Sequence, residues 1–309
     1  MNGPLVSVIV PVHNGERFLR ASIGSALAQS YPRLEIVVTD DGSTDTSATI
    51  LRELSADIRV IRQQRQGAAA ARNAAIAAAR GELLAFLDCD DLWDANKIER
   101  QVLLHERFPE AVASYCDHRI IDADDRVTGT TGALAYPRWS GRILRELVQG
   151  NCIVSPSVLM ARREAVLAAG GFDPTQPAGS DDWQLSMHLA ALGPILYLPE
   201  TLASYRRHDG NTSAAWSHRK SLGDLHALQS LVVRIGTSDD PGLQEIYRRA
   251  LYKAHLAAGW RHRQAGERGT ALHNYLQALR LHPWNLPLAL RIILLSVAPP
   301  SLMRTRTRS

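Results

Sequence analysis

Short apolar runs alternate with helical patterns along the first half of the chain. The runs are rich in β-branched residues, and Val6–Val10 is apolar almost throughout, which is typical of a strand with both faces covered. The predicted strands are Leu5–Val10, Leu34–Thr39, Ile58–Gln63, Leu83–Leu87 and Val112–Tyr115. The predicted helices are Arg17–Ser30, Asp45–Leu54, Ala68–Ala79 and Lys97–Arg107. This alternation predicts an α/β fold with a mostly parallel sheet and helices on both of its faces.

The alternation weakens from about Asp122, where glycines and prolines punctuate an irregular stretch. Beyond that stretch we expect a strand at Ser157–Met160 and helices at Arg162–Ala169 and Trp183–Ala191. After Tyr205 the pattern is helical to the end of the chain.

Charge divides the chain in the same region. Residues 216–309 hold 14 Lys and Arg against 5 Asp and Glu, a balance of +9, whereas residues 1–215 have a balance of −5. We therefore expect two parts, residues 1–215 and a basic helical extension over residues 216–309. A basic extension on an acidic body predicts contact with an anionic partner.

Composition excludes several other classes of protein. A hydrophobic content of 45% with 21% charged residues is ordinary for a globular protein. The three cysteines lack CxxC spacing, which argues against zinc or a disulfide framework and for a reducing compartment. No apolar run approaches the ~20 residues that a membrane-spanning helix needs, and the first run is stopped by Pro11. We expect a cytoplasmic protein without a signal peptide.

Polar residues follow the predicted strands, where ligands bind in parallel sheets. Pro11, His13 and Asn14 follow the first strand, and Asp40-Asp41-Gly42-Ser43 follows the second. The second group is also good turn chemistry, because Asp accepts backbone hydrogen bonds and Gly supplies the turn. These loops are candidates for ligand binding, for shaping the turn, or for both.

The fourth strand runs into three carboxylates, Asp88, Asp90 and Asp91. So much negative charge at the end of a buried strand is costly unless a cation faces it. A divalent cation on a diphosphate would supply that charge. The alternative is a strand end at which Asp90 or Asp91 caps a following helix.

Other ligand classes lack their markers. No GxGxxG follows a strand and no GxxxxGK[ST] occurs, so dinucleotide and P-loop sites are not indicated. DNA- and RNA-binding motifs are absent as well, and we expect no nucleic-acid partner.

Five blocks in order resemble the family 2 glycosyltransferases of GT-A fold. They are VSVIVPVHN (6–14), VVTDDGSTD (37–45), GAAAARNAAIAAARGELLAFLDCDD (67–91), GGFDPTQPAGSDDWQLSMHLA (170–190) and YRRHDGNTS (205–213). The resemblance implies a GT-A catalytic domain at residues 1–215 that transfers one sugar from a nucleotide-diphosphate sugar, a UDP-sugar first of all, with inversion. The QxxRW motif of the processive members is missing, which favours one transfer per encounter.

The resemblance also implies roles for residues. Asp88 and Asp90 would hold Mn²⁺ or Mg²⁺ on the diphosphate, with Asp90 as the direct ligand and Asp88 facing the ribose or acting through water. His208 would complete that site or stand as an ordinary surface residue. Asp182, placed before Trp183 like the family's carboxylate, would be the general base. The alternative for Asp182 is a carboxylate that only stabilises a helix start.

The remaining assignments concern the donor and the acceptor sides. By resemblance Asp41, with Asp40, would accept a hydrogen bond from the nucleotide base, while Pro11 and Asn14 shape the first loop. Arg72 would meet the phosphates or pair with an acid. Asp181 and Trp183 would contact the acceptor or shape the site; the family commonly has Glu at the position of Asp181.

The basic extension carries two further patterns. Residues 259–285 resemble one tetratricopeptide unit, which predicts a helical hairpin. Leu286–Val297 is apolar, and Arg304, Arg306 and Arg308 follow it. This end would lie on an anionic membrane surface, or pack as a helix with a disordered basic end. The first alternative fits a glycan or lipid-linked acceptor in envelope polysaccharide synthesis.

Two rival functions share features with this sequence. One is an inactive GT-A scaffold that binds a partner through its helical extension; the retained Asp88, Asp90 and Asp182 argue against it. The other is a sugar-1-phosphate nucleotidyltransferase, which needs a Gly-rich basic loop after the first strand, and PVHNGERF supplies none.

Overall fold

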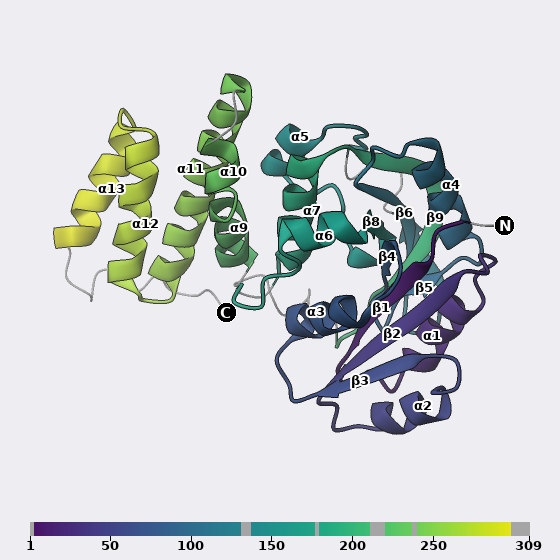
Figure 1. Ribbon diagram of the computed structural model, residues 1–309. Coiled ribbons are helices and arrows are strands. Elements are labelled where there is room, and N and C mark those ends of the chain that lie inside the picture. Colours follow the sequence, from purple (N-terminus) through teal and green to yellow (C-terminus); the bar gives the residue numbers. More distant parts are fainter. Residues whose placement is uncertain (1–2, 131–136, 177–178, 211–219, 237–239, 298–309) are drawn as a thin grey trace. The chain divides into compact units, whose positions relative to one another are not determined.

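The protein is described by a computed structural model over residues 3–130, 137–176, 179–210, 220–236 and 240–297 (Figure 1). It divides into two compact units, Met1–Gln176 with Ser180–Ala214, and Pro177–Gly179 with Ala215–Ser309. The candidate catalytic, nucleotide-binding and metal-binding residues all belong to the first unit.

Nine strands form one sheet among the described residues of the first unit, in the order β3-β2-β1-β4-β8-β6-β9-β5, with β7 paired to β6. The strands are β1 (Val6–Val12), β2 (Leu34–Asp41), β3 (Arg59–Gln63), β4 (Leu83–Phe86), β5 (Leu92–Trp93), β6 (Ala113–Ile121), β7 (Val127–Thr130), β8 (Leu159–Arg162) and β9 (Ile195–Arg206). All seven residues of β1 are buried, as expected for a strand covered on both faces.

The sheet is parallel from β3 to β4 and mixed beyond. Val6 of β1 aligns with Leu34 of β2 on one side and with Leu83 of β4 on the other. β8 then runs antiparallel to both β4 and β6, and β7 and β5 are antiparallel to their neighbours. The expectation of a mostly parallel sheet thus holds for β1 to β4, where a helix connects each strand to the next.

Strand β9 was not predicted from the sequence. Its run contains Pro199 and Glu200, which interrupt the apolar pattern. Against β6 the register jumps there, because Cys116 pairs with Leu198 whereas Asp117 pairs with Thr201. The bulge absorbs the two residues that weaken the strand signal.

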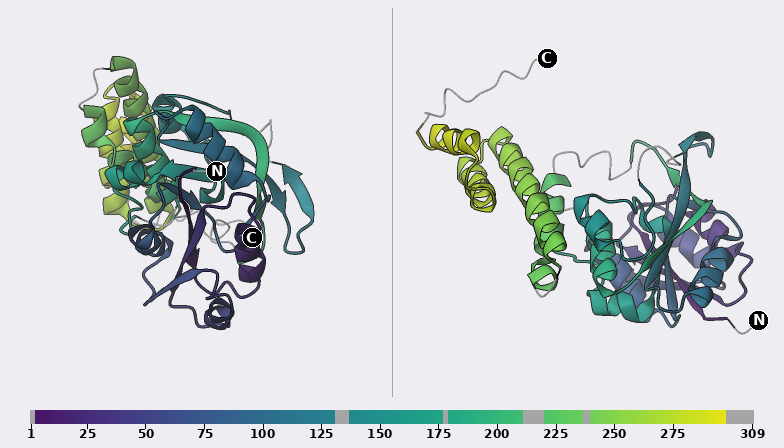
Figure 2. Two further views of the ribbon diagram at one scale, coloured as in Figure 1. Left: turned by 45° about the vertical axis from the view of Figure 1, so that its right-hand side comes forward. Right: turned by 90° about the horizontal axis from the view of Figure 1, so that it is seen from above.

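Helices cover both faces of the sheet (Figures 1 and 2). They are α1 (Leu19–Leu27), α2 (Ser47–Glu53), α3 (Ala68–Ala78), α4 (Lys97–Arg107), α5 (Leu144–Gln149), the short η1 (Pro156–Val158), α6 (Arg163–Ala169) and α7 (Asp181–Leu192). α3, α6 and α7 lie on one side of the sheet, and α1 and α4 lie on the other. Asp40 and Asp41 end β2, and Asp88 and Asp90 follow β4, so these candidates lie at the carboxyl ends of neighbouring parts of the sheet.

The second unit is helical throughout its described residues. Its helices are α9 (Lys220–Gln229), α10 (Val232–Gly236), α11 (Pro241–Gln264), α12 (Arg268–Leu281) and α13 (Leu286–Val297). α11 and α12 pack so closely that a Cβ on Gly259 would lie 2.7 Å from Cε1 of the fully buried Tyr275. Nowhere in residues 3–297 as described does a helix have the length and apolar character to cross a bilayer.

Candidate active site

The first two strand-end loops are joined by hydrogen bonds. The N–H of Asn14 donates to Ser43 Oγ (3.1 Å), and the N–H of Thr44 donates to Asn14 Oδ1 (2.8 Å). Asn14 adopts a left-handed backbone (φ 52°), which Asn tolerates better than most residues. Pro11 is buried within β1 opposite Thr39. Asn14 therefore joins the two loops, and the loop-shaping role expected for Pro11 stays a prediction.

Asp40 and Asp41 are buried at the end of β2, and Asp40 holds the turn that follows this strand. Asp40 Oδ1 accepts a hydrogen bond from the N–H of Ser43 (2.9 Å), and its side chain also lies 3.3 Å from Arg62. The Asp41 carboxylate accepts hydrogen bonds from the N–H groups of Gln66 (2.7 Å) and Gly67 (2.8 Å), just before α3. The turn role is thus present for Asp40, whereas the Asp41 carboxylate holds the loop before α3. A contact of either with a nucleotide base stays a prediction.

The loop after β4 separates the three carboxylates into two kinds. Asp91 is 1% exposed, and its oxygens accept hydrogen bonds from Ser157 Oγ (2.5 Å) and from the N–H of Arg206 (3.0 Å). Asp88 and Asp90 have side chains 25% and 26% exposed. The alternative of a helix N-cap at Asp90 or Asp91 is wrong, because β5 follows the loop and α4 begins only at Lys97.

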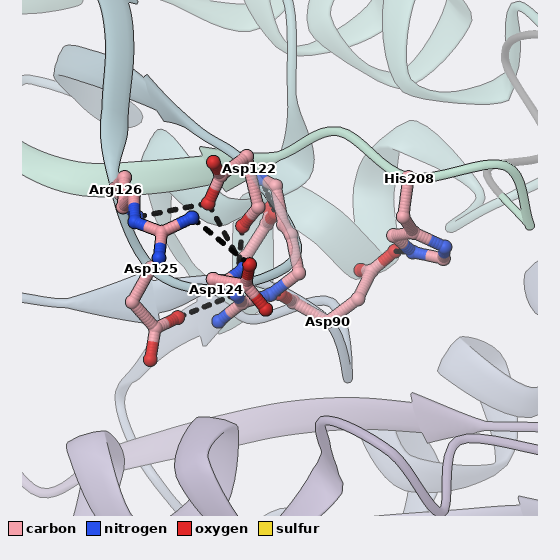
Figure 3. Close-up of polar contacts among 8 residues, drawn as sticks. Asp90, Asp122, Asp124, Asp125, Arg126 and His208 are labelled. Carbon is pink, nitrogen blue, oxygen red and sulfur yellow. Dashed lines mark hydrogen bonds and ion pairs between the residues drawn. The ribbon is translucent and has the colours of Figure 1, made fainter.

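Negative charge accumulates in this loop. Burial, with the nearby Asp88 charge, raises the pKa of Asp90, and burial with both neighbours raises the pKa of Asp91 well above its usual range. His208 Nε2 lies 3.1 Å from Asp90 Oδ2 (Figure 3). Carboxylate and imidazole are both ligands for divalent cations, Mn²⁺ among them. The oxygen and nitrogen ligands that Asp90 and His208 offer, and the excess negative charge of the loop, fit a divalent cation.

The described residues contain no complete set of three metal-ligating side chains. Mg²⁺ sites of enzymes that act on phosphates often use one or two carboxylates, and phosphate oxygens and water supply the other ligands. Asp90 and His208 would likewise supply only two protein ligands, and phosphate oxygens and water would supply the others.

Arg72 connects two of the candidate carboxylates. Its guanidinium donates to Asp88 Oδ1 (2.7 Å) and to Asp181 Oδ2 (2.9 Å), and it stacks 5.0 Å from the ring centroid of Phe172. Arg72 is only 6% exposed, so both ion pairs are shielded from water. Of the two expected roles, pairing with an acid is the one seen; a phosphate contact stays a prediction. The bridge joins α3, the loop after β4, and α7.

Asp182 lies in the first turn of α7 and lines a small recess with Ser155 and Phe172. Burial, reinforced by the charge of Asp181, raises the pKa of Asp182 to about 7, although the Trp183 N–H and Arg72 oppose the shift. Asp182 Oδ1 accepts the hydrogen bond from that N–H at 2.7 Å. The helix-start role and a pKa suited to proton transfer are therefore both present.

Trp183 anchors α7. Its indole Nε1 donates to the carbonyl of Leu147 in α5 (2.7 Å), and the side chain is 7% exposed. The expected site-shaping role fits this position, because the anchor fixes the helix start that carries Asp182.

Sequence reasoning missed two groups of site residues. Ser155 and Ser157 hold Asp91, and Arg206 contacts both Asp90 and Asp91. Ser157 opens a predicted strand and Ser155 lies just before it, and neither serine belongs to a motif. Arg206 lies within YRRHDGNTS, and its place two residues before His208 is the sequence signal that points to it.

A family model and the most similar relatives both identify this chain as similar to glycosyltransferases. Residues 7–168 match the model of glycosyl transferase family 2. An uncharacterized glycosyltransferase of Nostoc sp. is 36% identical over 213 residues, which cover 67% of this chain and 66% of that protein. The match thus spans just under two thirds of the relative's length. The Escherichia coli UDP-Glc:alpha-D-GlcNAc-diphosphoundecaprenol beta-1,3-glucosyltransferase WfgD is 44% identical over 105 residues, 33% of this chain and 41% of WfgD.

Solved structures show the same fold. S. aureus TarS in complex with UDP-GlcNAc superposes with a TM-score of 0.63 at 16% identity, over 89% of this chain and 91% of that one. The mannosyltransferase PcManGT of Pyrobaculum calidifontis, in complex with GDP-Man and Mn²⁺, superposes with a TM-score of 0.59 at 23% identity, over 95% of this chain and 79% of PcManGT. The fold of the chain is therefore that of these GT-A transferases.

Proposed function

Because the chain belongs to glycosyl transferase family 2, we propose that it transfers a single sugar from a nucleotide-diphosphate sugar to an acceptor hydroxyl, with inversion. The observation that carries this proposal is the arrangement around Arg72. One end of the guanidinium holds Asp88 of the carboxylate loop, and the other holds Asp181, next to the candidate base Asp182.

On the donor side, Asp90 and His208 would hold the divalent cation, with Asp88 acting through water or on the ribose. A cation there supplies positive charge to the diphosphate as it leaves. Support comes from PcManGT, whose structure contains Mn²⁺. A UDP-sugar is the proposed donor, since WfgD is named for UDP-Glc and TarS binds UDP-GlcNAc.

On the acceptor side, Asp182 would accept the proton of the attacking hydroxyl. The oxygen bonds to the anomeric carbon from the face opposite the diphosphate, and the bond to the diphosphate breaks. A single displacement of this geometry inverts the anomeric centre. We propose a glycan or lipid-linked acceptor because WfgD is named for a diphosphoundecaprenol-linked sugar.

The function is tested by transfer from a donor panel. The full chain is incubated with Mn²⁺, with UDP- or GDP-linked hexoses and N-acetylhexosamines, and with a synthetic GlcNAc-diphospho-lipid or free glycans. The product is measured by mass spectrometry. A product heavier by one hexose or N-acetylhexosamine is expected with one donor. If nucleotides bind but no donor is used with lipid-linked or free glycans, the inactive scaffold becomes the better account.

The pH dependence of transfer follows from the pKa of Asp182. Since a base must be ionised, kcat/KM is expected to rise as pH increases through about 7 and then to level off. Replacing Asp181 by Asn removes a charge that raises this pKa, so the acidic limb of the profile is expected to move to lower pH. Asp57→Asn, an exposed carboxylate before β3, is the matched control. An acidic limb that stays in place in Asp181→Asn would contradict this coupling.

We also propose that the second unit contacts an anionic membrane surface. Trp284, Leu286 and Leu290 are 88%, 74% and 61% exposed, and the last two lie one helical turn apart on α13. Leu288 and Ile292 occupy another face of α13 and pack in the core of the unit. Apolar side chains at the surface of a segment with a balance of +9 suit lipid headgroups of opposite charge. The arginines at 304, 306 and 308 lie outside the described residues.

Co-sedimentation with phosphatidylglycerol and with phosphatidylcholine vesicles tests the membrane contact. The triple variant Trp284→Ser, Leu286→Ser, Leu290→Ser is expected to weaken binding to phosphatidylglycerol at least ~10-fold, because the apolar area that enters the interface is lost. Val232→Ser with Val233→Ser removes similarly exposed side chains of α10 and serves as the control. Equal binding by the triple variant and the unchanged chain would refute the contact.

A further inference from the structure

Arg206, the last residue of β9, is a charged side chain with only 1% of its surface exposed. Its Nε donates to the carbonyl of Asp90 (2.7 Å), and one terminal nitrogen donates to the carbonyl of Asp122 (3.1 Å). The same nitrogen forms an ion pair with Asp125. A buried guanidinium is costly unless its donors are paired with acceptors. Here those acceptors come from the carboxylate loop and from the turn between β6 and β7.

The same residue lies beside the candidate metal ligands. Arg206 stacks on the ring of Phe18 (4.5 Å from Cζ to the ring centroid), and the ring of His208 packs on Phe18 with centroids 4.7 Å apart. The N–H of Arg206 donates to Asp91 (3.0 Å), which fixes the next residue of the loop. Arg206 thus touches the backbone of Asp90 directly and reaches His208 through Phe18.

The turn between β6 and β7 supplies the countercharge. Asp125 adopts a left-handed backbone (φ 65°), which is uncommon for any residue other than Gly. Its side chain is 59% exposed, yet it points at the buried Arg206. Figure 3 shows Asp122 and Asp125 on one side of Asp90 and His208 on the other. The turn is therefore attached to the metal-ligand pair through one buried arginine.

We propose that Arg206 is a positioning residue that sets the relative orientation of Asp90 and His208, and that Asp125 holds Arg206 in place for this task. The inference builds on the proposed function, because it concerns the cation that this pair would bind. Residues that orient metal ligands typically change metal affinity 10–100-fold when they are replaced. An arginine needed only for folding would change stability and leave the affinity for the cation unaltered.

The test measures the affinity of the full chain for Mn²⁺ in saturating UDP, from the electron paramagnetic resonance signal of free Mn²⁺. Arg206→Gln is expected to weaken Mn²⁺ binding about 10-fold or more. Asp125→Asn, which keeps a residue that tolerates the left-handed backbone, is expected to weaken it by a smaller factor in the same direction. The exposed neighbours Arg207→Gln and Asp124→Asn serve as controls and should bind Mn²⁺ as the unchanged chain does.

Thermal unfolding in EDTA checks that each variant is folded. If Arg206→Gln does not fold, Asp125→Asn decides the question, because its side chain is at the surface. Unaltered Mn²⁺ affinity in the folded variants would overturn the positioning role while leaving the proposed function intact. If the unchanged chain itself binds no Mn²⁺ with UDP, the proposed metal site fails and the positioning role fails with it.

Discussion

Replacing Asp182 by Asn is expected to lower kcat by about 10²–10⁴-fold, the range associated with loss of a general base. Asn is nearly the same size and can still accept the hydrogen bond from the N–H of Trp183, so the start of α7 should persist. The amide cannot take a proton from the acceptor hydroxyl. The affinity for the nucleotide should change little, because the proposed donor contacts lie in the other loops.

This prediction is measured by steady-state transfer together with calorimetric titration of the nucleotide. Glu164→Gln removes an exposed carboxylate of α6 and is the matched control. Retention of most of the kcat by Asp182→Asn would show that this carboxylate serves only as a favourable charge at the helix start.

The second large effect is expected at Asp90. Asp90→Asn removes the charge that faces His208. Because the diphosphate would be held through the metal, the affinity of this variant for UDP in Mn²⁺ should fall to the level found in EDTA. The expected loss of affinity is about 100-fold. The measurement is titration of UDP with Mn²⁺ and with EDTA, for the unchanged chain and for the variant.

Asp91→Asn gives the contrasting control from the same loop. Because Asp91 is buried and accepts hydrogen bonds from Ser157 and Arg206, its replacement should lower the free energy of unfolding by about 1–3 kcal/mol. Asp91→Asn should lower the Mn²⁺-dependent affinity for UDP less than Asp90→Asn does. If both variants lost the same Mn²⁺-dependent affinity, the division into a ligand and a loop-holding carboxylate would be wrong.

The first half of the fold could be predicted from sequence because its signals are local. Val6–Val12 is apolar except for Ser7, Leu83–Phe86 is apolar throughout, and the turn chemistry of Asp40 to Ser43 lies within a few residues. Helix α4 begins and ends at the predicted residues, Lys97 and Arg107. Each of these features depends on neighbours along the chain, which the hydrophobic pattern records.

The parts that were missed depend on distant partners. Asp91 looks like Asp90 in the sequence, yet its hydrogen-bond donors are 64 to 115 residues away. Arg206 meets Asp90 across 116 positions. Strand β9 carries Pro199 and Glu200 in a bulge, and pairing with β6 and β5 makes the run a strand. Tertiary contacts decide these features, so local patterns could not reveal them.

The most direct test of the whole account is calorimetric titration of the full chain with UDP, in Mn²⁺ and in EDTA, with GDP as the comparison. The account predicts that UDP binds in Mn²⁺, that EDTA abolishes or strongly weakens the binding, and that Asp90→Asn behaves in Mn²⁺ as the unchanged chain does in EDTA. Absence of binding by either nucleotide in Mn²⁺ would contradict a metal-dependent donor site at Asp90 and His208.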